Sequence, residues 1–158
     1  MKDIVTQTQY SLPDLPDGKK RNFKTTNTLI TPNNKYYYEY ATGLKTGSTS
    51  LALYNLSASA TRDDFSLIAV IMKAPSTKIR FAEAQKLLDY GFNNFSFKQF
   101  GKKGDLVKKI NVDKGVQNTV DCILSDSAGT LIEKGKEKNV EQNITLDDTV
   151  SAPISKGQ

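Results

Sequence analysis

The sequence contains no histidine and only one cysteine among its 158 residues. Without histidine, neither a Ser-His-Asp triad nor a Cys-His pair can form, and nearly every kind of zinc site is excluded. The single cysteine, Cys122, cannot form a disulfide within the chain. It lies in the alternating run 120–124, which favours a small buried apolar residue over a reactive thiol. We therefore expect neither a metal nor a cofactor, while serine–lysine chemistry remains compatible with the composition.

Long apolar runs are absent as well. No stretch approaches the roughly 18 consecutive apolar residues of a transmembrane helix, and the N-terminus is too polar for a secretory signal peptide. Hydrophobic residues make up 37% of the chain and charged residues 25%, which is typical of a folded globular protein with a modest core. The length predicts one domain or two small ones.

Arginine is sparse, although the net charge is +5. The positive charge comes mainly from lysines spread along the chain, a pattern typical of a solvated surface. A dedicated nucleic-acid reader would use arginine forks for phosphates and bases. The tyrosines at 36–38 and 40 could form a stacking platform for single-stranded nucleic acid, but packing of their rings is the favoured interpretation. We therefore expect no nucleic-acid partner.

Residues 1–12 are rich in β-formers and are predicted to be extended. Two prolines and the pair Asp17-Gly18 predict a turn after this segment, followed by a polar connector at 19–24. A second turn is predicted at 31–34, where proline fixes φ and asparagine tolerates unusual backbone angles.

Three strands are predicted in the middle of the chain, at 42–48, 51–61 and 66–73. Because short connections join them, they predict an antiparallel meander whose first strand lies at an edge, open to a ligand. The continuously apolar run 67–72 predicts that the third strand is buried on both faces.

A helix is predicted after Pro75, with Ser76 or Thr77 capping its first N–H groups. Gly91 is predicted to stop it. Arg80 lies in its first turn, where a cation opposes the macrodipole, so a local reason for its presence is expected. Residues at helical spacing are predicted to pack on the sheet. They are Phe81, Ala84, Leu87, Leu88 and Phe92.

The pattern changes after Phe95 to short β-like runs separated by turns that contain glycine or aspartate. These runs lie at 106–112, 116–124, 129–133 and 140–146. Their spacing predicts a small all-β, sandwich-like domain, and residues 152–158 look like the start of a further strand. The fold class expected for the whole chain is therefore α+β.

The first predicted strand carries the sequence Lys45-Thr46-Gly47. Side chains alternate along a strand, so Lys45 and Gly47 are expected on one face and Thr46 on the other. A glycine two places after a lysine leaves the backbone open to pair with an extended peptide, beside an ammonium group. The alternative interpretation is a turn or sheet edge with an exposed lysine, because three residues are a weak signal.

Five blocks, in this order and spacing, resemble the low-molecular-mass penicillin-binding proteins that act as serine-type D-Ala-D-Ala carboxypeptidases. The blocks are 25–30, 40–49, 54–61, 67–72 and 80–92. The resemblance implies that residues 1–94 form the C-terminal part of a penicillin-binding, β-lactamase-like peptidase domain. It implies that 95–158 form part of the β-rich accessory domain that follows, with the signal peptide and the membrane-anchoring tail outside this chain.

The family's mechanism uses a nucleophilic serine and a basic lysine in Ser-x-x-Lys, a Ser-x-Asn block and a Lys-Thr-Gly strand. The chain contains neither of the first two blocks. The resemblance implies substrate binding by Lys45, Thr46 and Gly47, with Lys45 as an auxiliary catalytic group. It also implies that the N–H of Ser48 supplies half of the oxyanion hole and that Arg80 holds the substrate's terminal carboxylate. A surface salt bridge is the alternative for Arg80.

The leading hypothesis is a fragment of a carboxypeptidase that removes the terminal D-Ala from peptidoglycan stem peptides, inactive alone because the nucleophile is missing. Its partners would be a stem peptide or a β-lactam, in the extracytoplasmic cell envelope, with membrane contact only through a tail outside the chain. Exposed sheet edges could also pair two copies into a homodimer. The alternative is a non-catalytic module that binds cell-wall peptides or a protein partner.

Overall fold

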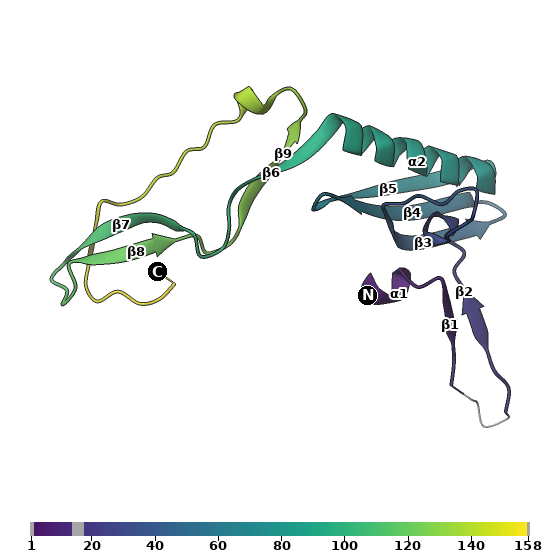
Figure 1. The fold of residues 1–158 in the computed structure, drawn as a ribbon, viewed down its shortest axis with the longest axis horizontal. Helices are drawn as coiled ribbons and strands as arrows, with labels where there is room; N and C mark the ends of the chain where they lie inside the picture. The colour runs from purple at the N-terminus through teal and green to yellow at the C-terminus, as the bar shows by residue number, and fades with distance from the viewer. Residues whose placement is uncertain (1, 14–17, 158) are drawn as a thin grey trace. The chain divides into compact units, whose positions relative to one another are not determined.

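The computed structural model describes residues 2–13 and 18–157, and the chain divides into two compact units, Met1–Asn94 and Phe95–Gln158 (Figure 1). The described residues of the first unit form two α-helices, a short 3-10 helix and five strands. These are α1 (Lys2–Val5), β1 (Gln9–Ser11), β2 (Asn22–Lys24), η1 (Thr28–Ile30), β3 (Ala41–Thr49), β4 (Leu53–Arg62), β5 (Phe65–Ala74) and α2 (Thr77–Asn94).

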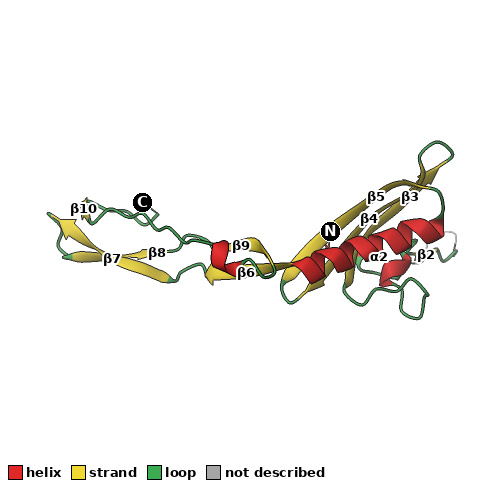
Figure 2. Cartoon of the chain, turned by 90° about the horizontal axis from the view of Figure 1, so that it is seen from above, coloured by secondary structure: helices red, strands yellow, loops and turns green. Residues whose placement is uncertain are grey.

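The first unit is organised around an antiparallel sheet with the strand order β3-β4-β5. The helix α2 runs along one face of this sheet (Figure 2). The small side chains of Ala58, Ala60 and Ala69 let the helix approach, and Phe81 and Phe92 fill the space between the two layers. The predicted meander and the helix that follows it are therefore confirmed.

The start of α2 also follows the prediction, whereas the exposure of Leu87 and the end of the helix do not. Ser76 Oγ accepts a hydrogen bond from the N–H of Ile79 at 3.2 Å, which is an N-cap. Leu87 is 49% exposed, so it does not belong to the buried stripe. Gly91 does not stop the helix, which continues to Asn94. A Cβ at Gly91 would lie 2.4 Å from Leu67 Cδ1, so the glycine permits close packing of α2 on β5.

The prediction that β5 is buried on both faces is wrong. Ile68, Val70 and Met72 are 70%, 57% and 78% exposed, and they alternate with Ala69, which is buried against α2. Only one face of β5 is covered by the residues that the structure describes. A run of apolar residues cannot by itself show whether a second layer lies over the other face.

The N-terminal segment is only partly extended, because residues 2–5 form the helical turn α1. The polar connector predicted at 19–24 is also wrong in part, since β2 pairs with β1 in a two-stranded antiparallel ribbon. Hydrogen bonds from Thr25 N to Thr8 O and from Leu12 N to Arg21 O, both 2.9 Å, extend this ladder. Pro16 and Asp17 of the predicted turn lie outside the described residues.

Three of the four tyrosines before β3 pack against the core, in agreement with the favoured interpretation, whereas Tyr37 is 43% exposed. The ring of Tyr36 stacks on Phe81 with centroids 5.3 Å apart, and Tyr40 meets Phe92 edge-on at 6.0 Å. Tyr38 donates a hydrogen bond to Asp89 Oδ1 at 2.7 Å, and burial together with this carboxylate raises the pKa of Tyr38. The tyrosines therefore fasten the segment before β3 to α2.

The second unit contains two small sheets and is all-β apart from a short 3-10 helix. One sheet pairs β6 with β9, and the other has the order β10-β7-β8. Their elements are β6 (Phe95–Gly101), β7 (Leu106–Asp113), β8 (Thr119–Ile123), β9 (Ala128–Glu133), η2 (Glu137–Asn139) and β10 (Thr149–Ser151). The α+β class predicted for the chain, with a β-rich second part, is confirmed.

Several details of the second unit differ from the sequence-based expectations, beginning with β6, for which no strand was predicted. Residues 140–146 form no strand, and residues 152–157 are irregular, whereas β10 just before them was not predicted. Cys122 is partly exposed instead of buried. No helix in the described part of the chain is long and apolar enough to cross a membrane.

The close packing at Gly91 can be tested with Gly91→Val. We expect this variant to lower the free energy of unfolding by about 2 kcal/mol, because the added side chain overpacks the contact with Leu67. Urea denaturation measures the change. Asn93→Val, an exposed position on the same helix, is the control and should change stability far less. A loss in Gly91→Val no larger than that in Asn93→Val would contradict overpacking against Leu67, because valine is a better helix former than glycine.

Candidate functional site

The Lys45-Thr46-Gly47 segment lies in β3, an edge strand of the described sheet. Lys45 is paired with Ser57, and Thr46 is paired with Leu56, a core residue beneath α2. Their side chains therefore leave the strand on opposite faces, as predicted for consecutive strand residues. Lys45 is exposed and Thr46 is only 9% exposed.

Thr26 connects these two side chains at the edge of the sheet. Lys45 Nζ donates to Thr46 O at 2.8 Å and to Thr26 Oγ1 at 3.3 Å. The hydroxyl groups of Thr26 and Thr46 share a further hydrogen bond. The lysine ammonium is thus held in one place by oxygen atoms and is not paired with a carboxylate among the described residues. It is therefore available to pair with an anionic ligand.

Gly47 leaves open space above the strand. A Cβ built there would have no heavy atom within 4 Å, and the backbone is not in the left-handed region. The fold therefore does not require a glycine at this position. The absence of a side chain instead leaves the backbone between Lys45 and Ser48 accessible, which is the condition for pairing with an extended peptide.

Ser48 is exposed near the end of β3 and pairs with Tyr54 across the turn into β4. Both line a hollow of about 290 Å³ at this turn. Asn55 fixes the turn, because its Nδ2 donates to Ala52 O at 3.0 Å and its Oδ1 accepts from Lys73 N at 2.9 Å. The backbone around Ser48 is therefore anchored to β4 and β5.

Arg80 reaches the same end of the sheet from α2. It is 7% exposed, and its guanidinium lies 4.9 Å from the ring centroid of Phe81 and 5.5 Å from that of Tyr54. One nitrogen, Nη1, donates to Asn55 O at 3.4 Å, while Nε has no hydrogen-bond partner among the described residues. Loss of solvent lowers the pKa of Arg80, although a guanidinium stays charged at neutral pH.

The surface salt bridge considered for Arg80 is absent, since no described carboxylate pairs with this buried cation. A buried charge without a counter-ion is costly, so such groups often mark a place where an anion binds. Asn55, whose carbonyl accepts from Arg80, is the cross-strand partner of Gly47. The structure therefore brings Arg80 next to the Gly47–Ser48 end of β3, whereas Lys45 leaves the strand on the other face.

Sequence reasoning missed Thr26, Tyr54 and Asn55. Thr26 is far from Lys45 in the chain, and only the folded structure shows that it orients the ammonium. Tyr54 and Asn55 were interpreted as ordinary strand residues, and their contacts with Arg80 depend on how α2 packs. The described residues contain no group of three or more histidine, cysteine, aspartate or glutamate side chains that could hold a metal ion.

Two family models match the chain in succession. The model described as D-alanyl-D-alanine carboxypeptidase matches residues 4–76, and the model described as penicillin-binding protein 5, C-terminal domain, matches residues 95–158. The chain belongs to the D-alanyl-D-alanine carboxypeptidase family of low-molecular-mass penicillin-binding proteins. The resemblance based on the blocks around Lys45-Thr46-Gly47 is thereby confirmed.

Curated relatives and solved structures of this family agree with the assignment. The chain is 36% identical to D-alanyl-D-alanine carboxypeptidase DacF of Bacillus subtilis, over 89% of this chain and 35% of the relative. It is 37% identical to DacC of Escherichia coli, over 99% of this chain and 41% of the relative. The crystal structure of penicillin-binding protein 5 from Haemophilus influenzae has a TM-score of 0.74 at 31% identity, covering 99% of this chain and 43% of that one.

A second solved structure, the Streptomyces K15 DD-transpeptidase, matches with a TM-score of 0.51 at 30% identity, over 58% of this chain and 35% of that one. The chain therefore spans 35–43% of the length of the family members described here.

The buried charge of Arg80 can be tested with Arg80→Met, which keeps the length of the side chain and removes the charge. We expect the free energy of unfolding to rise by about 1 kcal/mol, because an unpaired buried charge is replaced by an apolar group. Urea denaturation measures the change. Arg62→Met is the comparison, because Arg62 donates to Phe92 O and should lose stability when replaced. If Arg80→Met lost more stability than Arg62→Met, Arg80 would be a structural residue.

Proposed function

We propose that this chain supplies the peptide-holding part of a serine-type D-Ala-D-Ala carboxypeptidase site. The observation that carries the proposal is the open segment of β3, where Lys45 projects a fixed ammonium and Gly47 leaves the backbone accessible. An extended peptide that pairs with this edge gains backbone hydrogen bonds, which is how β-strand addition binds peptides.

Two cations are assigned roles in this proposal. Arg80, buried and without a carboxylate partner, attracts the terminal carboxylate of the peptide at the Gly47–Ser48 end of β3. Lys45 acts as an auxiliary group beside the scissile bond, and Thr46 contributes through the strand backbone and through its hydrogen bond with Thr26, which orients the lysine. The N–H of Ser48 forms half of the oxyanion hole, where a backbone donor stabilises negative charge in the transition state.

Catalysis needs a nucleophile that these 158 residues do not contain, because the sequence has no Ser-x-x-Lys and no Ser-x-Asn block. Loss of the nucleophile alone commonly costs on the order of a million-fold in rate. We infer that the chain on its own is inactive. It contributes one wall of a site that is completed by other residues of the longer family protein.

The uncovered side of the sheet supports a larger domain. Ile68, Val70 and Met72 form an exposed apolar row on the face of β5 opposite α2, and β5 has no further strand beyond it among the described residues. An apolar face and an unpaired edge on the same strand are unusual in an isolated soluble domain. In the proposal, further peptidase residues cover both.

The family membership supports a cellular setting as well. We infer that the longer protein acts outside the cytoplasm, in the cell envelope, on the D-Ala-D-Ala end of peptidoglycan stem peptides, and that it binds β-lactams there. In this proposal the residues 1–94 belong to the peptidase domain and 95–158 to the β-rich accessory domain.

A second candidate is a non-catalytic module that binds cell-wall peptides or a protein partner. The observation that favours it is the combination of a formed peptide-holding strand with the absence of a nucleophile in this chain. The two candidates differ in what the chain does by itself. A module binds a peptide with useful affinity, whereas a part of an enzyme site binds it weakly.

Peptide binding is tested by titrating the chain with a peptide that ends in D-Ala-D-Ala, followed by NMR. We expect weak, saturable binding that shifts signals of β3. Arg80→Ala removes the cation assigned to the terminal carboxylate, and Lys45→Ala removes the ammonium assigned to the scissile bond, so each should weaken binding about tenfold. Lys78→Ala, an exposed lysine on α2, is the matched control and should bind like the parent chain. The L-Ala-L-Ala peptide should bind less tightly.

The absence of the nucleophile is tested by incubating the chain with a fluorescent penicillin and measuring its intact mass. We expect no increase in mass, because no serine is placed beside a basic lysine in the sequence. A covalent adduct would contradict the assignment of the chain as inactive by itself.

Self-association through the exposed strand is tested by sedimentation at increasing protein concentration. We expect concentration-dependent dimers, and we expect Val70→Lys to weaken association about tenfold, because charged residues on edge strands oppose strand pairing. Leu87→Lys replaces an exposed apolar residue of α2 and is the control. An equal effect of both variants would show that general hydrophobic association, and not β5, drives the dimer.

A further inference from the structure

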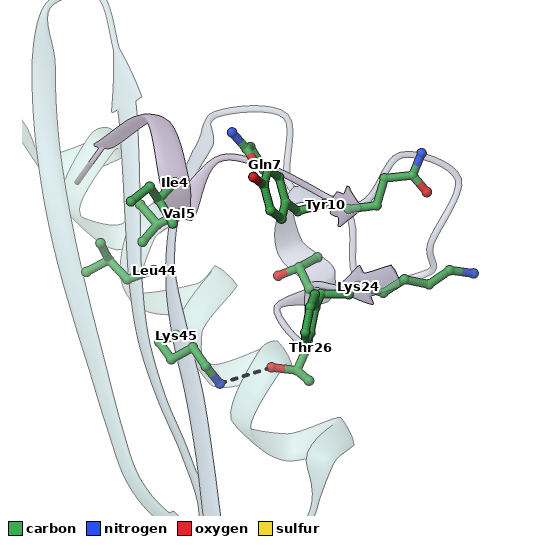
Figure 3. A pocket seen from close by; sticks show the side chains of 11 residues that line it. Ile4, Val5, Gln7, Tyr10, Lys24, Thr26, Leu44 and Lys45 are labelled. Carbon is green, nitrogen blue, oxygen red and sulfur yellow. Dashed lines mark hydrogen bonds between the residues drawn. The ribbon is translucent and has the colours of Figure 1, made fainter. Parts of the chain in front are cut away.

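A pocket of about 530 Å³ lies beside Lys45, between α1, the β1–β2 ribbon and β3 (Figure 3). The residues that line it come from the first part of the chain and from β3. The pocket is separate from the Gly47–Ser48 end of β3 where Arg80 lies, and it shares with the proposed peptide site only Lys45. Its volume lies within the range typical of small-ligand sites.

One wall of the pocket is aromatic. Tyr10 and Phe23 are cross-strand partners in the β1–β2 ribbon, so their side chains leave the same face of the ribbon. They remain 52% and 53% exposed. A ribbon of two short strands has little core of its own, so two neighbouring rings turned to an open pocket are available for a ligand.

The facing wall is aliphatic and is formed by Ile4, Val5 and Leu44, which lie close together in Figure 3. Ile4 is 72% exposed. The distance between α1 and β3 is set by Gly43, which has a φ of +148°, and a Cβ there would lie 2.9 Å from Val5 Cγ2. The glycine therefore allows the aliphatic wall to approach the strand closely and fixes the width of the pocket on this side.

A single cation lies at the base of the pocket. Lys45 points toward Thr26, and the dashed line in Figure 3 marks their hydrogen bond. Lys24 also belongs to the lining, but its ammonium extends away from the pocket in the same view. None of the lining residues is acidic. The pocket thus combines two apolar walls with one positive charge and no negative charge of its own.

We propose that this pocket binds a small carboxylate ligand that also carries an apolar group. The carboxylate pairs with Lys45, and an aromatic or branched aliphatic side chain packs between Tyr10–Phe23 and Ile4–Val5. Pairing a compact charge with an adjacent apolar surface selects ligands that carry both features. This preference goes beyond the proposed function, because it depends only on the residues that line the pocket.

The ligand preference of the pocket is tested with three small molecules, a reference compound and two others that each lack one of its features. They are 3-phenylpropionate, propionate, which lacks the ring, and 3-phenylpropan-1-ol, which lacks the charge. NMR titration of the whole chain measures their affinities and shows which residues respond. We expect 3-phenylpropionate to bind about tenfold more tightly than either of the others, with shifts at Tyr10, Phe23 and Lys45.

Variants on separate walls keep the test independent of any one substitution. Phe23→Ala, Ile4→Ser and Lys45→Gln should each weaken binding of 3-phenylpropionate, and Ile4→Ser remains informative if Phe23→Ala disturbs the ribbon. Tyr90→Ala removes an exposed aromatic ring of α2 outside the pocket and is the matched control, which should bind like the parent chain. The amide spectrum of each variant shows whether it is folded.

Equal binding of propionate would overturn the role of the apolar walls, and equal binding of 3-phenylpropan-1-ol would overturn the role of Lys45. Failure of all three probes to bind would overturn the proposal as a whole. A chain that binds 3-phenylpropionate in this pocket but does not bind the D-Ala-D-Ala peptide would support the pocket and contradict the proposed function. The two proposals therefore fail in distinguishable ways.

Discussion

The packing of α2 on an alanine-lined face of the sheet is the interaction on which the rest of the first unit depends. Ala58, Ala60 and Ala69 let the helix lie close, and Phe81 and Phe92 occupy the space that remains. Since one face of the sheet is fixed in this way, Thr46 is directed inward and Lys45 outward. The same helix carries the guanidinium of Arg80 to the end of β3, so a single contact between layers positions both cations of the site.

The central meander and its helix could be predicted because their periodicities are strong and local. The β1–β2 ribbon could not, since its ladder is completed by contacts such as Thr25 with Thr8 that no local pattern reveals. The role of Gly91 was misjudged for a related reason. Near a helix end, glycine usually signals a stop, whereas here it permits contact with Leu67, and only the position of β5 determines which applies.

The candidate site also contains residues that could be predicted from the sequence and residues that could not. The sequence identified the segment Lys45-Thr46-Gly47 as a candidate site from its three consecutive residues and its place in a predicted edge strand. The family model that matches residues 4–76 agrees with that interpretation. Which roles these residues and Arg80 have in binding stays a prediction. Thr26 and Asn55 escaped notice because their contribution is a hydrogen bond to a residue distant in the chain. Polar partners of this kind leave no periodic trace in a sequence.

The hydroxyl of Thr26 lies between the side chains of Lys45 and Thr46. The ammonium of Lys45 can only donate, so Thr26 Oγ1 accepts from it, and the hydroxyl groups of Thr26 and Thr46 share the next hydrogen bond, in which either group can be the donor. Lys45 and Thr46 leave β3 on opposite faces. A residue outside the sheet therefore couples the exposed side of the strand to the side beneath α2, so that a shift of one of these side chains displaces the other.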